Sequence, residues 1–236
     1  MWYAKPTGGY TSSSTEGRTN ATNIASYLEA QGWSLTSICA LLGNGAGESG
    51  LNPWRWESDY IPTVNEFSNW TQQQEMQHGY GIFGFTPARK YINSTNQSQL
   101  YSYGYAPNFS DLQGNATDGL AQLIYFMSTV AANWTHNLYN YYEPEFTAIG
   151  VDISTFYNVS YSDFIHGVNG NTPMTLAECV GAFELCYEKP AASAAASSYN
   201  NRVAAAQAWY NYFSQTPVPP YVVSSSHRLP IWMYGI

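Results

Sequence analysis

The spacing of hydrophobic residues predicts a mainly helical protein. Apolar residues recur every three or four positions in three segments, 20–31, 118–134 and 199–213, and this is the period of an amphipathic helix. The segment 35–47 is different, because Ile38 to Leu42 are apolar almost without interruption. A helix that is apolar on all sides is usually buried. We therefore expect the segment 35–47 at the centre of the fold.

Local signals predict shorter helices between the long ones. Thr175 and Glu178 have the spacing of a capping box, which opens a helix that reaches about Glu188. A helical turn is expected at 161–166, and a short helix at 86–92 begins with Thr86 and Pro87. The segments 93–115 and 191–198 are polar or rich in small residues, so loops are predicted there.

Residues 52–85 carry no sustained helical or strand period. The first part, 52–79, is rich in tryptophan and carboxylates, and long irregular segments of this kind are often functional. The second part, Gly79–Phe85, contains three glycines. Glycines at this density predict a tight turn or a small hairpin rather than a plain strand.

These boundaries divide the chain of 236 residues into three parts. Residues 1–18 are expected to form an extended lead-in, and residues 19–214 to form one domain. Residues 215–236 are expected to be a proline-rich tail or docking segment. A chain of this length can bury a sizeable core. The predicted fold class is mainly α, or α+β with a small hairpin.

Composition narrows the classes of partner. Hydrophobic residues make up 44% of the chain and charged residues only 10%, which is typical of a folded protein with an uncharged polar surface. The formal net charge is −8 and no basic run is present, so nucleic acid is not an expected partner. The sequence shows neither a signal peptide nor an apolar run of about 18 residues. We therefore expect no membrane span.

The cysteines and histidines suggest no cofactor. Cys39, Cys179 and Cys186 are expected to be buried thiols, because the last two lie too far apart on one predicted helix to form a disulfide. The histidines lack the spacing of zinc ligands, so no metal is expected. A cysteine peptidase that uses Cys39 and His78 is a weak alternative. A reactive thiol lies at a helix start in an electropositive pocket, whereas Cys39 lies inside an apolar run.

Glu48 is the residue with the clearest chemical role. It follows the apolar helix and precedes Ser49-Gly50-Leu51-Asn52-Pro53, where small residues and a proline end a helix. A carboxylate at the C-terminal end of a buried helix meets the negative pole of the helix dipole and loses hydration. Both effects favour its protonated form. A glutamic acid that stays protonated at neutral pH can act as a general acid.

A second motif follows the one that contains Glu48. It is Gly79-Tyr80-Gly81-Ile82-Phe83-Gly84-Phe85-Thr86-Pro87-Ala88. Together the two motifs resemble the bacteriophage tail lysozyme family, the peptidoglycan-cutting domains of virion tail tips, which are related to lysozymes and lytic transglycosylases. The similarity continues in the segments 121–126, 183–190 and 201–206. It therefore covers most of the chain, roughly residues 20–214.

The resemblance implies a lysozyme-like helical domain with a small β-hairpin that lines the substrate cleft. It implies that Glu48 is the general acid. It also implies that Tyr80, Gly81, Phe83 and Phe85 form the wall of the cleft, where glycine lets a sugar approach the backbone. Phe83 or Phe85 could equally face the core.

Roles are also predicted for three further residues, Trp54, Trp56 and Arg202. Trp54 and Trp56 are placed to stack on sugar rings, although a tryptophan just after a buried helix is as often part of the core. Arg202 resembles an arginine of the family's last helix. We expect a structural role for it, in which it pairs with a carboxylate such as Glu184 or Glu188.

The group that completes the reaction is left open by the sequence. Inverting enzymes need a base about 6.5–9.5 Å from the acid, retaining enzymes need a nucleophile about 5–5.5 Å away, and some relatives use the acetamido group of the substrate. Four carboxylates lie in the right region, Glu57, Asp59, Glu66 and Glu75. Glu57 and Asp59 are favoured slightly, because they follow Trp54 and Trp56 closely.

The predicted function is that of a muramidase that cleaves the β-1,4 glycan strand of peptidoglycan. Such a protein would be carried in the virion on a phage tail, together with other tail proteins, and would act at the host cell wall to aid DNA entry. One alternative is a lytic transglycosylase with the same acid. The other is a virion structural or wall-binding protein that has the fold without the activity.

Overall fold

A computed structural model describes residues 2–5, 7–62, 64–75, 77–92, 118–135 and 138–222. Most of them are helical. The α-helices are α1 (Thr15–Ala30), α2 (Leu35–Glu48), α3 (Val64–Asn69), α4 (Gln72–Glu75), α6 (Asp118–Asn133), α7 (Tyr139–Ala148), α8 (Tyr161–His166), α9 (Leu176–Phe183) and α10 (Ala192–Gln215).

Shorter elements connect these helices. The 3-10 turns are η1 (Glu57–Asp59), η2 (Ala88–Lys90) and η3 (Ile153–Thr155), and η4 (Glu184–Glu188) is a π-helix that continues α9. One antiparallel sheet pairs β1 (Val168–Asn169) with β2 (Thr172–Pro173). The mainly helical α+β class with a small antiparallel sheet is therefore confirmed. The sheet does not lie at the predicted hairpin, Gly79–Phe85, where Tyr80 and Phe85 form an isolated bridge.

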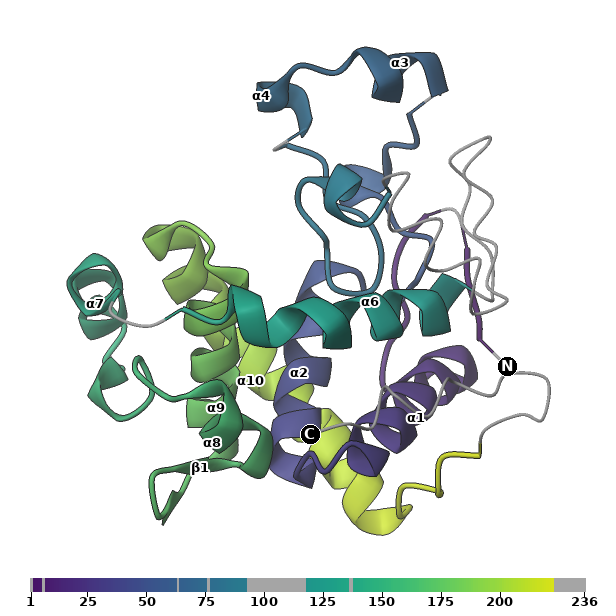
Figure 1. The fold of residues 1–236 in the computed structure, drawn as a ribbon. Coiled ribbons are helices and arrows are strands. Elements are labelled where there is room, and N and C mark those ends of the chain that lie inside the picture. Colours follow the sequence, from purple (N-terminus) through teal and green to yellow (C-terminus); the bar gives the residue numbers. More distant parts are fainter. Residues whose placement is uncertain are drawn as a thin grey trace.

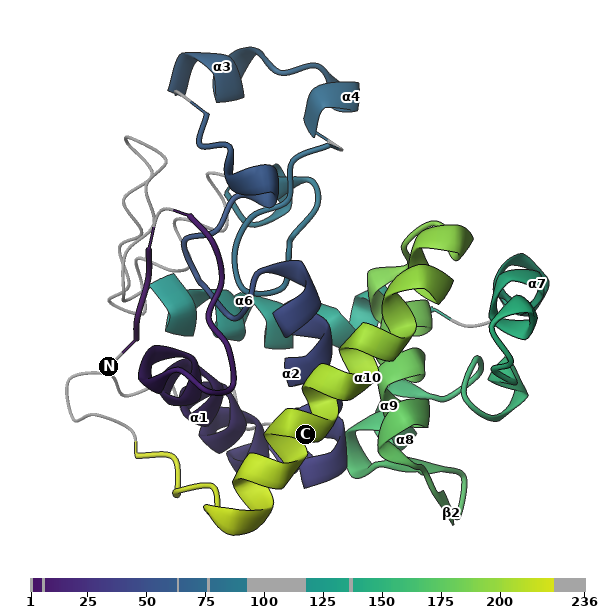
Figure 2. The same cartoon turned by 180° about the vertical axis from the view of Figure 1, so that it is seen from behind.

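Helix α2 lies at the centre of the helical body (Figures 1 and 2), in contact with α1, α8, α9 and α10. The side chain of Ser34 caps its first turn by accepting from the backbone N–H of Ser37. The Ser37 hydroxyl donates to the carbonyl of Phe164 on α8. These bonds fix the start of α2 beside α8 and the small sheet, so Glu48, at the other end of α2, points away from that sheet.

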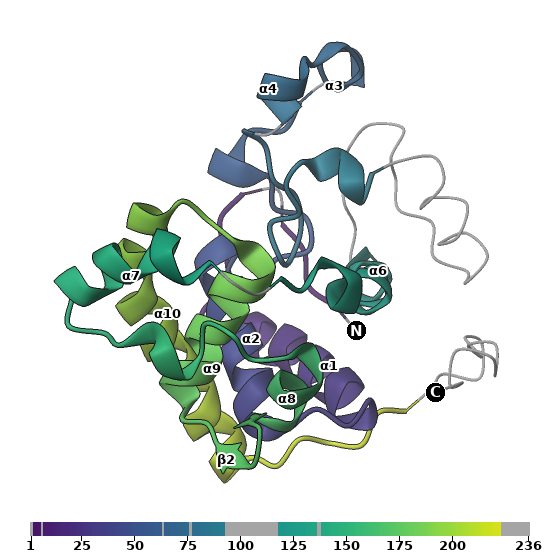
Figure 3. The same ribbon diagram turned by 60° about the vertical axis from the view of Figure 1, so that its left-hand side comes forward.

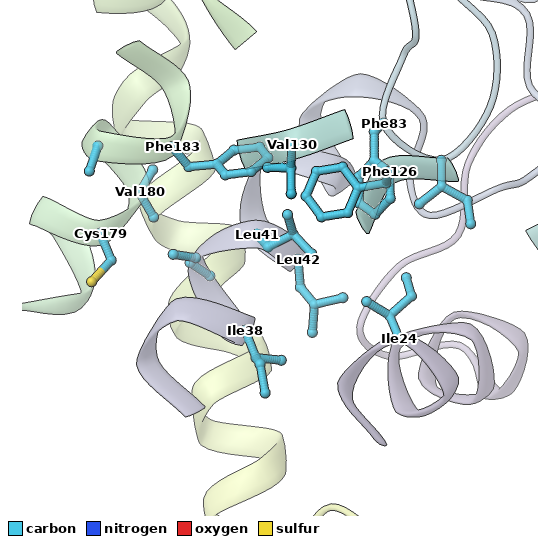
Figure 4. Packing of buried hydrophobic residues seen from close by; sticks show 14 of the residues in the cluster. Ile24, Ile38, Leu41, Leu42, Phe83, Phe126, Val130, Cys179, Val180 and Phe183 are labelled. Atoms are coloured by element: carbon cyan, nitrogen blue, oxygen red, sulfur yellow. The ribbon is translucent and has the colours of Figure 1, made fainter. Parts of the chain in front are cut away.

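The core surrounds α2 on several sides. Figure 4 shows Leu41 and Leu42 of α2 between three side chains from other helices. These are Ile24 of α1, Phe126 of α6 and Phe183 of α9. All five side chains are fully buried. Burial of one leucine or phenylalanine side chain contributes about 1.5–3 kcal/mol. The prediction that the segment 35–47 forms the central helix is confirmed.

Helices α2 and α10 approach each other closely at Gly43. A Cβ atom at Gly43 would lie 2.6 Å from the Cβ of Ala206 and 2.6 Å from the carbonyl oxygen of Arg202. Only a residue without a side chain fits there. This close contact brings Arg202 beside the last turns of α2, and the geometry of the candidate site described below depends on it.

A separate lobe, residues 52–92, projects from the helical body above the C-terminal end of α2 (Figures 1 and 3). It contains η1, α3, α4 and η2. The expectation of an entirely irregular region at 52–79 is therefore wrong. Helices of one or two turns are too short to give a readable hydrophobic period, and this explains why the pattern did not reveal them.

Several other boundaries differ from the prediction. Helix α1 starts at Thr15, after the Ser14 cap, so the lead-in is shorter than predicted. The loop predicted at 191–198 belongs to α10, because its alanines are strong helix formers. The helix expected at 86–92 is reduced to η2, and Thr86 turns its hydroxyl back to the carbonyl of Gly84 rather than capping a helix. The loop expected at 93–115 lies outside the described residues.

Other predicted elements are confirmed. Helices α6 and α8 fall where the spacing placed them, and both halves of the Thr175 and Glu178 capping box are present. The segment beyond Thr175 remains helical to Glu188, although its last turn is the π-helix η4. Within the described part of the chain, no helix combines the length and the apolar character needed to cross a bilayer.

Gly43→Ala should lower the free energy of unfolding by about 1–3 kcal/mol, because the added methyl group overpacks the contact between α2 and α10. Gly47→Ala is the matched control on the same helix. Its Cβ would lie 3.5 Å from Arg202 Cγ and 3.6 Å from Arg202 Cζ and Nε, which are ordinary van der Waals contacts, so its stability should be unchanged or slightly higher. Urea denaturation measures both variants. An equal loss of stability in the two variants would contradict this packing argument.

Candidate active site

Glu48 is the last residue of α2, and the chain turns sharply after it. The backbone N–H of Ser49 closes the helix on the carbonyl of Gly45, and the Ser49 hydroxyl donates to the carbonyl of Ile82 at 2.7 Å. Gly50 and Leu51 follow with φ of 61° and 57°. The end of α2 is thus fastened to the Gly79–Phe85 segment, as the pairing of the two sequence motifs suggests.

The Gly79–Phe85 segment forms a tight turn beside Glu48. Tyr80 and Phe85 exchange both backbone hydrogen bonds, at 3.2 and 2.9 Å. Gly84 has a φ of +56°, and a Cβ atom there would lie 2.7 Å from Glu48 Oε2. A glycine at position 84 therefore allows both the backbone conformation and the carboxylate beside it.

Gln122 of α6 holds this turn in place. Its side chain is fully buried, its Oε1 accepts from the backbone N–H of Ile82 at 2.7 Å, and its Nε2 donates to the carbonyl of Pro53 at 2.6 Å. A Cβ at Gly81 would lie 2.3 Å from that same Oε1. The amide of Gln122 therefore fixes both segments that flank Glu48. This gives a physical role to the glutamine of the segment 121–126, which resembles the family.

Two hollows share Glu48 in their linings, and we call them the larger and the smaller arm of the candidate cleft. The larger arm has a volume of about 580 Å³ and reaches across Phe83, Phe85 and Tyr125 to Tyr187 and Lys189. The smaller arm, of about 260 Å³, is lined by Arg55, Glu57 and the glycines of the turn. Glu48, Gly84 and Thr86 line both arms. A polymer that crosses this cleft would pass the carboxylate of Glu48 with chain on either side.

The guanidinium of Arg202, on α10, binds three carboxylates. Its Nη2 lies 2.5 Å from Glu48 Oε1, its Nη1 lies 2.5 Å from Glu188 Oε2, and its Nε lies 3.1 Å from Glu184 Oε1. Nη1 also donates to the Asn44 amide oxygen at 2.9 Å. We call Glu48, Glu184, Glu188 and Arg202 the charge cluster. The expected pairing of Arg202 with Glu184 or Glu188 is confirmed, and both carboxylates take part.

The three carboxylates of the charge cluster differ in their exposure. The Glu48 side chain is 31% exposed, whereas those of Glu184 and Glu188 are 0% and 9% exposed. The sequence led us to expect that Glu48 loses its hydration. The structure shows the largest loss at Glu184 and Glu188 instead, because η4 turns both inward against α10.

Burial changes the protonation of the inner carboxylates. Loss of hydration raises the pKa of Glu184 to about 7, although Arg202 opposes this change. Burial, followed by the charge of Glu48, raises the pKa of Glu188 well above its ordinary value. Burial lowers the pKa of Arg202, but the three carboxylates more than offset this effect and its pKa is raised. The guanidinium therefore stays charged beside two buried carboxyl groups, Glu184 and Glu188, whose protonated forms are favoured.

One oxygen of each inner carboxylate has no hydrogen-bond partner among the described residues. These atoms are Glu184 Oε2 and Glu188 Oε1. An unpaired buried oxygen is costly when the group is ionised and less costly when it is protonated. This geometry agrees with the raised pKa of both groups. Because the sites interact, the protons they retain belong to the charge cluster as a whole.

The two favoured candidates for a second catalytic group, Glu57 and Asp59, lie in different surroundings. Glu57 lines the smaller arm together with Glu48, and its Oε2 accepts from the backbone N–H of Gly79 at 2.8 Å. Asp59 instead pairs with Arg55 at 3.2 Å and accepts from the backbone N–H of Gly8. The structure brings Glu57 to the cleft and turns Asp59 toward the N-terminal segment.

The remaining candidates lie farther along the projecting lobe or outside the described atoms. Glu66 accepts from the hydroxyl of Tyr60 at 2.8 Å and lines a different hollow, beside Trp70 and His78. The side chain of Glu75 lies outside the described part of the structure. Of the described carboxylates in this region, Glu57 is the one that lines the cleft with Glu48.

The aromatic residues expected at the cleft fall into two groups. Phe83 and Phe85 line the larger arm although both are mostly buried, so each serves the core and the wall together. Trp56 is fully buried and Tyr80 is 2% exposed, with their ring centroids 4.8 Å apart. Stacking of Trp56 on a sugar is therefore excluded in this structure. The prediction that Tyr80 forms the wall of the cleft is also wrong, because its buried ring lines neither arm.

Trp54 and Gly81 complete the set of residues predicted for the cleft. Trp54 is partly buried against the core, and its indole N–H is buried with no partner among the described residues. It does not line either arm of the cleft. Gly81 lines the smaller arm, with a φ of +84° that favours glycine.

The cysteines do not form a nucleophilic site. All three are free and buried. Burial raises the pKa of Cys39 to about 12, which is the opposite of what an activated thiol requires. His78 stacks on Trp70 in the projecting lobe, with the two ring centroids 4.5 Å apart, whereas Cys39 lies on α2. The structure contradicts the peptidase alternative.

The sequence did not reveal that Arg202 binds Glu48 as well as the inner carboxylates. A signal for this contact was present, however. Asn44 and Glu184 are polar residues inside otherwise apolar helices, and buried polar groups need partners. Which groups they would meet depended on how α2, η4 and α10 pack, and spacing along one helix carries no information about this.

Comparison with known proteins agrees with these observations. The model of a family described as phage tail lysozyme matches residues 19–213. Morphogenesis protein 1 of Bacillus phage B103 is 32% identical over 81 residues. That alignment covers 34% of this chain and 19% of the phage protein, so the similarity concerns about a fifth of the relative's length.

Stability should depend on pH through Glu184. Its pKa is about 7 in the folded protein and 4.5 in a model glutamate, so between these values the folded state binds more protons than the unfolded state. The free energy of unfolding contributed by this group should therefore fall as pH rises from about 4.5 to about 7, by at most roughly 3 kcal/mol. Glu184→Gln should remove this loss.

Urea denaturation at pH 5 and pH 8 measures the effect. Glu184→Gln should gain stability relative to the wild type on going from pH 5 to pH 8. Glu145→Gln, which removes an exposed carboxylate on α7, is the control and should show the same difference from wild type at both values. If the two variants behave alike, the buried carboxylate does not set this dependence.

Proposed function

The chain belongs to the phage tail lysozyme family, and from this premise we propose that it is a muramidase that cleaves the β-1,4 glycan strand of peptidoglycan with Glu48 as general acid. Family membership supports a peptidoglycan-lytic enzyme. The observation that carries the proposal is the position of Glu48, which lines both arms of the cleft. A glycosidic oxygen of a strand bound across both arms would pass beside it.

Glu48 has the access and the fixation that a proton donor needs. Its Oε1 is held by Arg202, and its Oε2 lies against Gly84 in the cleft. The partial exposure of its side chain leaves room for a substrate oxygen, whereas Glu184 is completely enclosed. A positioned acid accelerates such a step by about 10²–10⁴-fold, because an unassisted alkoxide is a poor leaving group.

The charge cluster supplies a physical reason for a proton at this site. If all three carboxylates were ionised, one guanidinium would face two negative charges in excess, and two of the carboxylates are removed from water. Retaining a proton relieves both costs. In this proposal, Glu48 is the member of the charge cluster that delivers the proton to the substrate, since it is the member most exposed to the cleft.

Glu57 is the proposed second carboxylate. It would accept a proton from a water molecule as that water attacks the anomeric carbon. The bond from this carbon to the glycosidic oxygen breaks, and the proton from Glu48 passes to the leaving oxygen. The support is that Glu57 and Glu48 line the same arm. A lytic transglycosylase would need no second carboxylate to activate water, because a hydroxyl of the substrate attacks the anomeric carbon and the ionised Glu48 can accept its proton.

The proposed setting is a phage virion. The relative named a morphogenesis protein comes from a Bacillus phage, and the family is that of phage tail lysozymes. We propose that this chain is carried on the tail beside other tail proteins and opens the host wall for DNA entry. A wall-binding protein without activity is the competing proposal, and it differs in predicting no cleavage.

Glu48→Gln keeps the size of the side chain and its contact with Arg202 but removes the acidic proton. It should lower the rate of wall digestion by about 10²–10⁴-fold while the circular dichroism spectrum and melting temperature stay near those of the wild type. Turbidity clearing of purified sacculi measures the rate. Asp59→Asn is the matched control, because it also neutralises a carboxylate near the cleft yet should keep most of the activity.

Wild-type rates for Glu48→Gln would refute the assignment of the acid. If the wild-type protein binds sacculi but releases no soluble fragments, the proposal of a wall-binding protein without activity is correct instead.

Glu57→Gln tests the second group and the reaction type together. A hydrolase that uses Glu57 as base should lose at least about 10²-fold in rate, and its wild-type products should carry reducing ends. Mass spectrometry of digested sacculi detects these ends. Products with anhydro sugar ends, formed at an unchanged rate by Glu57→Gln, would show a lytic transglycosylase.

A further inference from the structure

The larger arm of the cleft contains two of the three lysines in the chain. Lys90 and Lys189 both line it, and Lys5 lies elsewhere, over the ring of Tyr10. In a protein with a net charge of −8 and 16 acidic residues, lysines are scarce. Two of them therefore line one arm, together with the carboxylates Glu48 and Glu188.

Lys189 occupies a backbone position that does not suit lysine. It follows the π-helix η4 in the left-handed conformation, with φ and ψ both 53°. Glycine or asparagine adopts this conformation at lower cost. Lys189 Nζ donates to the carbonyl of Asn133 and to the hydroxyl of Thr135, at 3.1 and 3.0 Å. The ammonium is thus held at a fixed place on one wall of the larger arm.

Lys90 lies on the projecting lobe, at the end of η2, and it faces the same space. Partial burial, followed by the positive charge of Lys189, lowers the pKa of Lys90. Two ammonium groups that repel each other across a groove are stabilised when an anion lies between them. The nearby carboxylates of Glu48 and Glu188 each form an ion pair with Arg202.

We propose that Lys90 and Lys189 form a binding site for a carboxylate carried by the muramic acid unit of the substrate strand. This inference rests on the proposed function, because it concerns the same cleft. In peptidoglycan the neutral N-acetylglucosamine alternates with N-acetylmuramic acid. The lactyl group of the latter ends in a free carboxylate or begins a stem peptide that bears carboxylates. Charge-assisted hydrogen bonds to such a group are stronger than neutral ones.

This site would give the enzyme a preference for acidic wall glycan over neutral chitin-like strands. Lys189 could instead serve only to satisfy the carbonyl of Asn133 at the end of α6, as lysines near helix ends commonly do. That structural role accounts for Lys189 alone. It does not explain why Lys90, from a different lobe, lines the same arm.

Binding measurements in the Glu48→Gln protein test the proposal without turnover. Isothermal titration at low ionic strength would compare three tetrasaccharides: chitotetraose, the peptide-free glucosamine–muramic acid tetrasaccharide, and the same tetrasaccharide with stem peptides. We expect the acidic strands to bind about tenfold more tightly than chitotetraose. Added salt should reduce this preference. The comparison of the two acidic strands identifies whether the lactyl or a stem carboxylate is bound.

Lysine variants in the same background assign the preference. Lys90→Gln should remove most of it, and Lys189→Arg, which keeps the charge, should retain it. Lys5→Gln is the matched control, because it removes the same charge outside the cleft and should leave the preference intact. Melting temperatures of all variants exclude unfolding as the cause.

The outcomes separate this proposal from the proposed function. Equal affinity for neutral and acidic strands, equal effects of Lys90→Gln and Lys5→Gln, or no glycan binding at all would overturn the lysine site. Wall digestion by the wild type and its loss in Glu48→Gln would still support the muramidase. Conversely, a lysine-dependent preference in a protein that digests no wall would support the site and refute the enzyme.

Discussion

Arg202 joins three segments of the chain at one guanidinium. Its carboxylate partners come from the end of α2 and from η4, while Arg202 itself lies on α10. Removing one partner of a buried ion pair commonly costs about 3–5 kcal/mol, because the other charge stays buried without compensation. The packing of α2 against α10 and the π-helical turn of η4 must therefore form together. The charge cluster links the stability of the fold to the position of the acid.

Close backbone approach makes this arrangement possible. Gly43 lets α10 come within contact of α2, and Gly84 lets the Tyr80–Phe85 turn lie directly on the Glu48 carboxylate. Gln122 then fixes the turn from the side of α6. The two glycines leave room for these close contacts, and Gln122 supplies the hydrogen bonds. Together they place the partly exposed carboxylate of Glu48 in the cleft, where Glu57 also lines the smaller arm.

The two sides of the cleft have different chemistry. The smaller arm carries Glu57 and backbone groups of the turn, which suits the activation of water beside the acid. The larger arm carries aromatic walls and the two lysines, which suits a sugar strand with acidic substituents. In the proposed function, catalysis depends on the smaller arm and substrate choice on the larger arm. The proposed functions of the two arms can be tested independently for this reason.

The sequence alone determined the helical class, the central helix, the end of that helix at Glu48 and the family. Hydrophobic spacing and capping residues act locally, and glycine-rich motifs mark turns wherever they occur. The tertiary structure decided that Trp56 is buried, that Glu57 rather than Asp59 lines the cleft, and that Arg202 binds Glu48. These outcomes depend on which residues far apart in the sequence come together. The loss of hydration expected at Glu48 occurs mainly at Glu184 and Glu188, because burial of a charge is decided by the packing of whole helices.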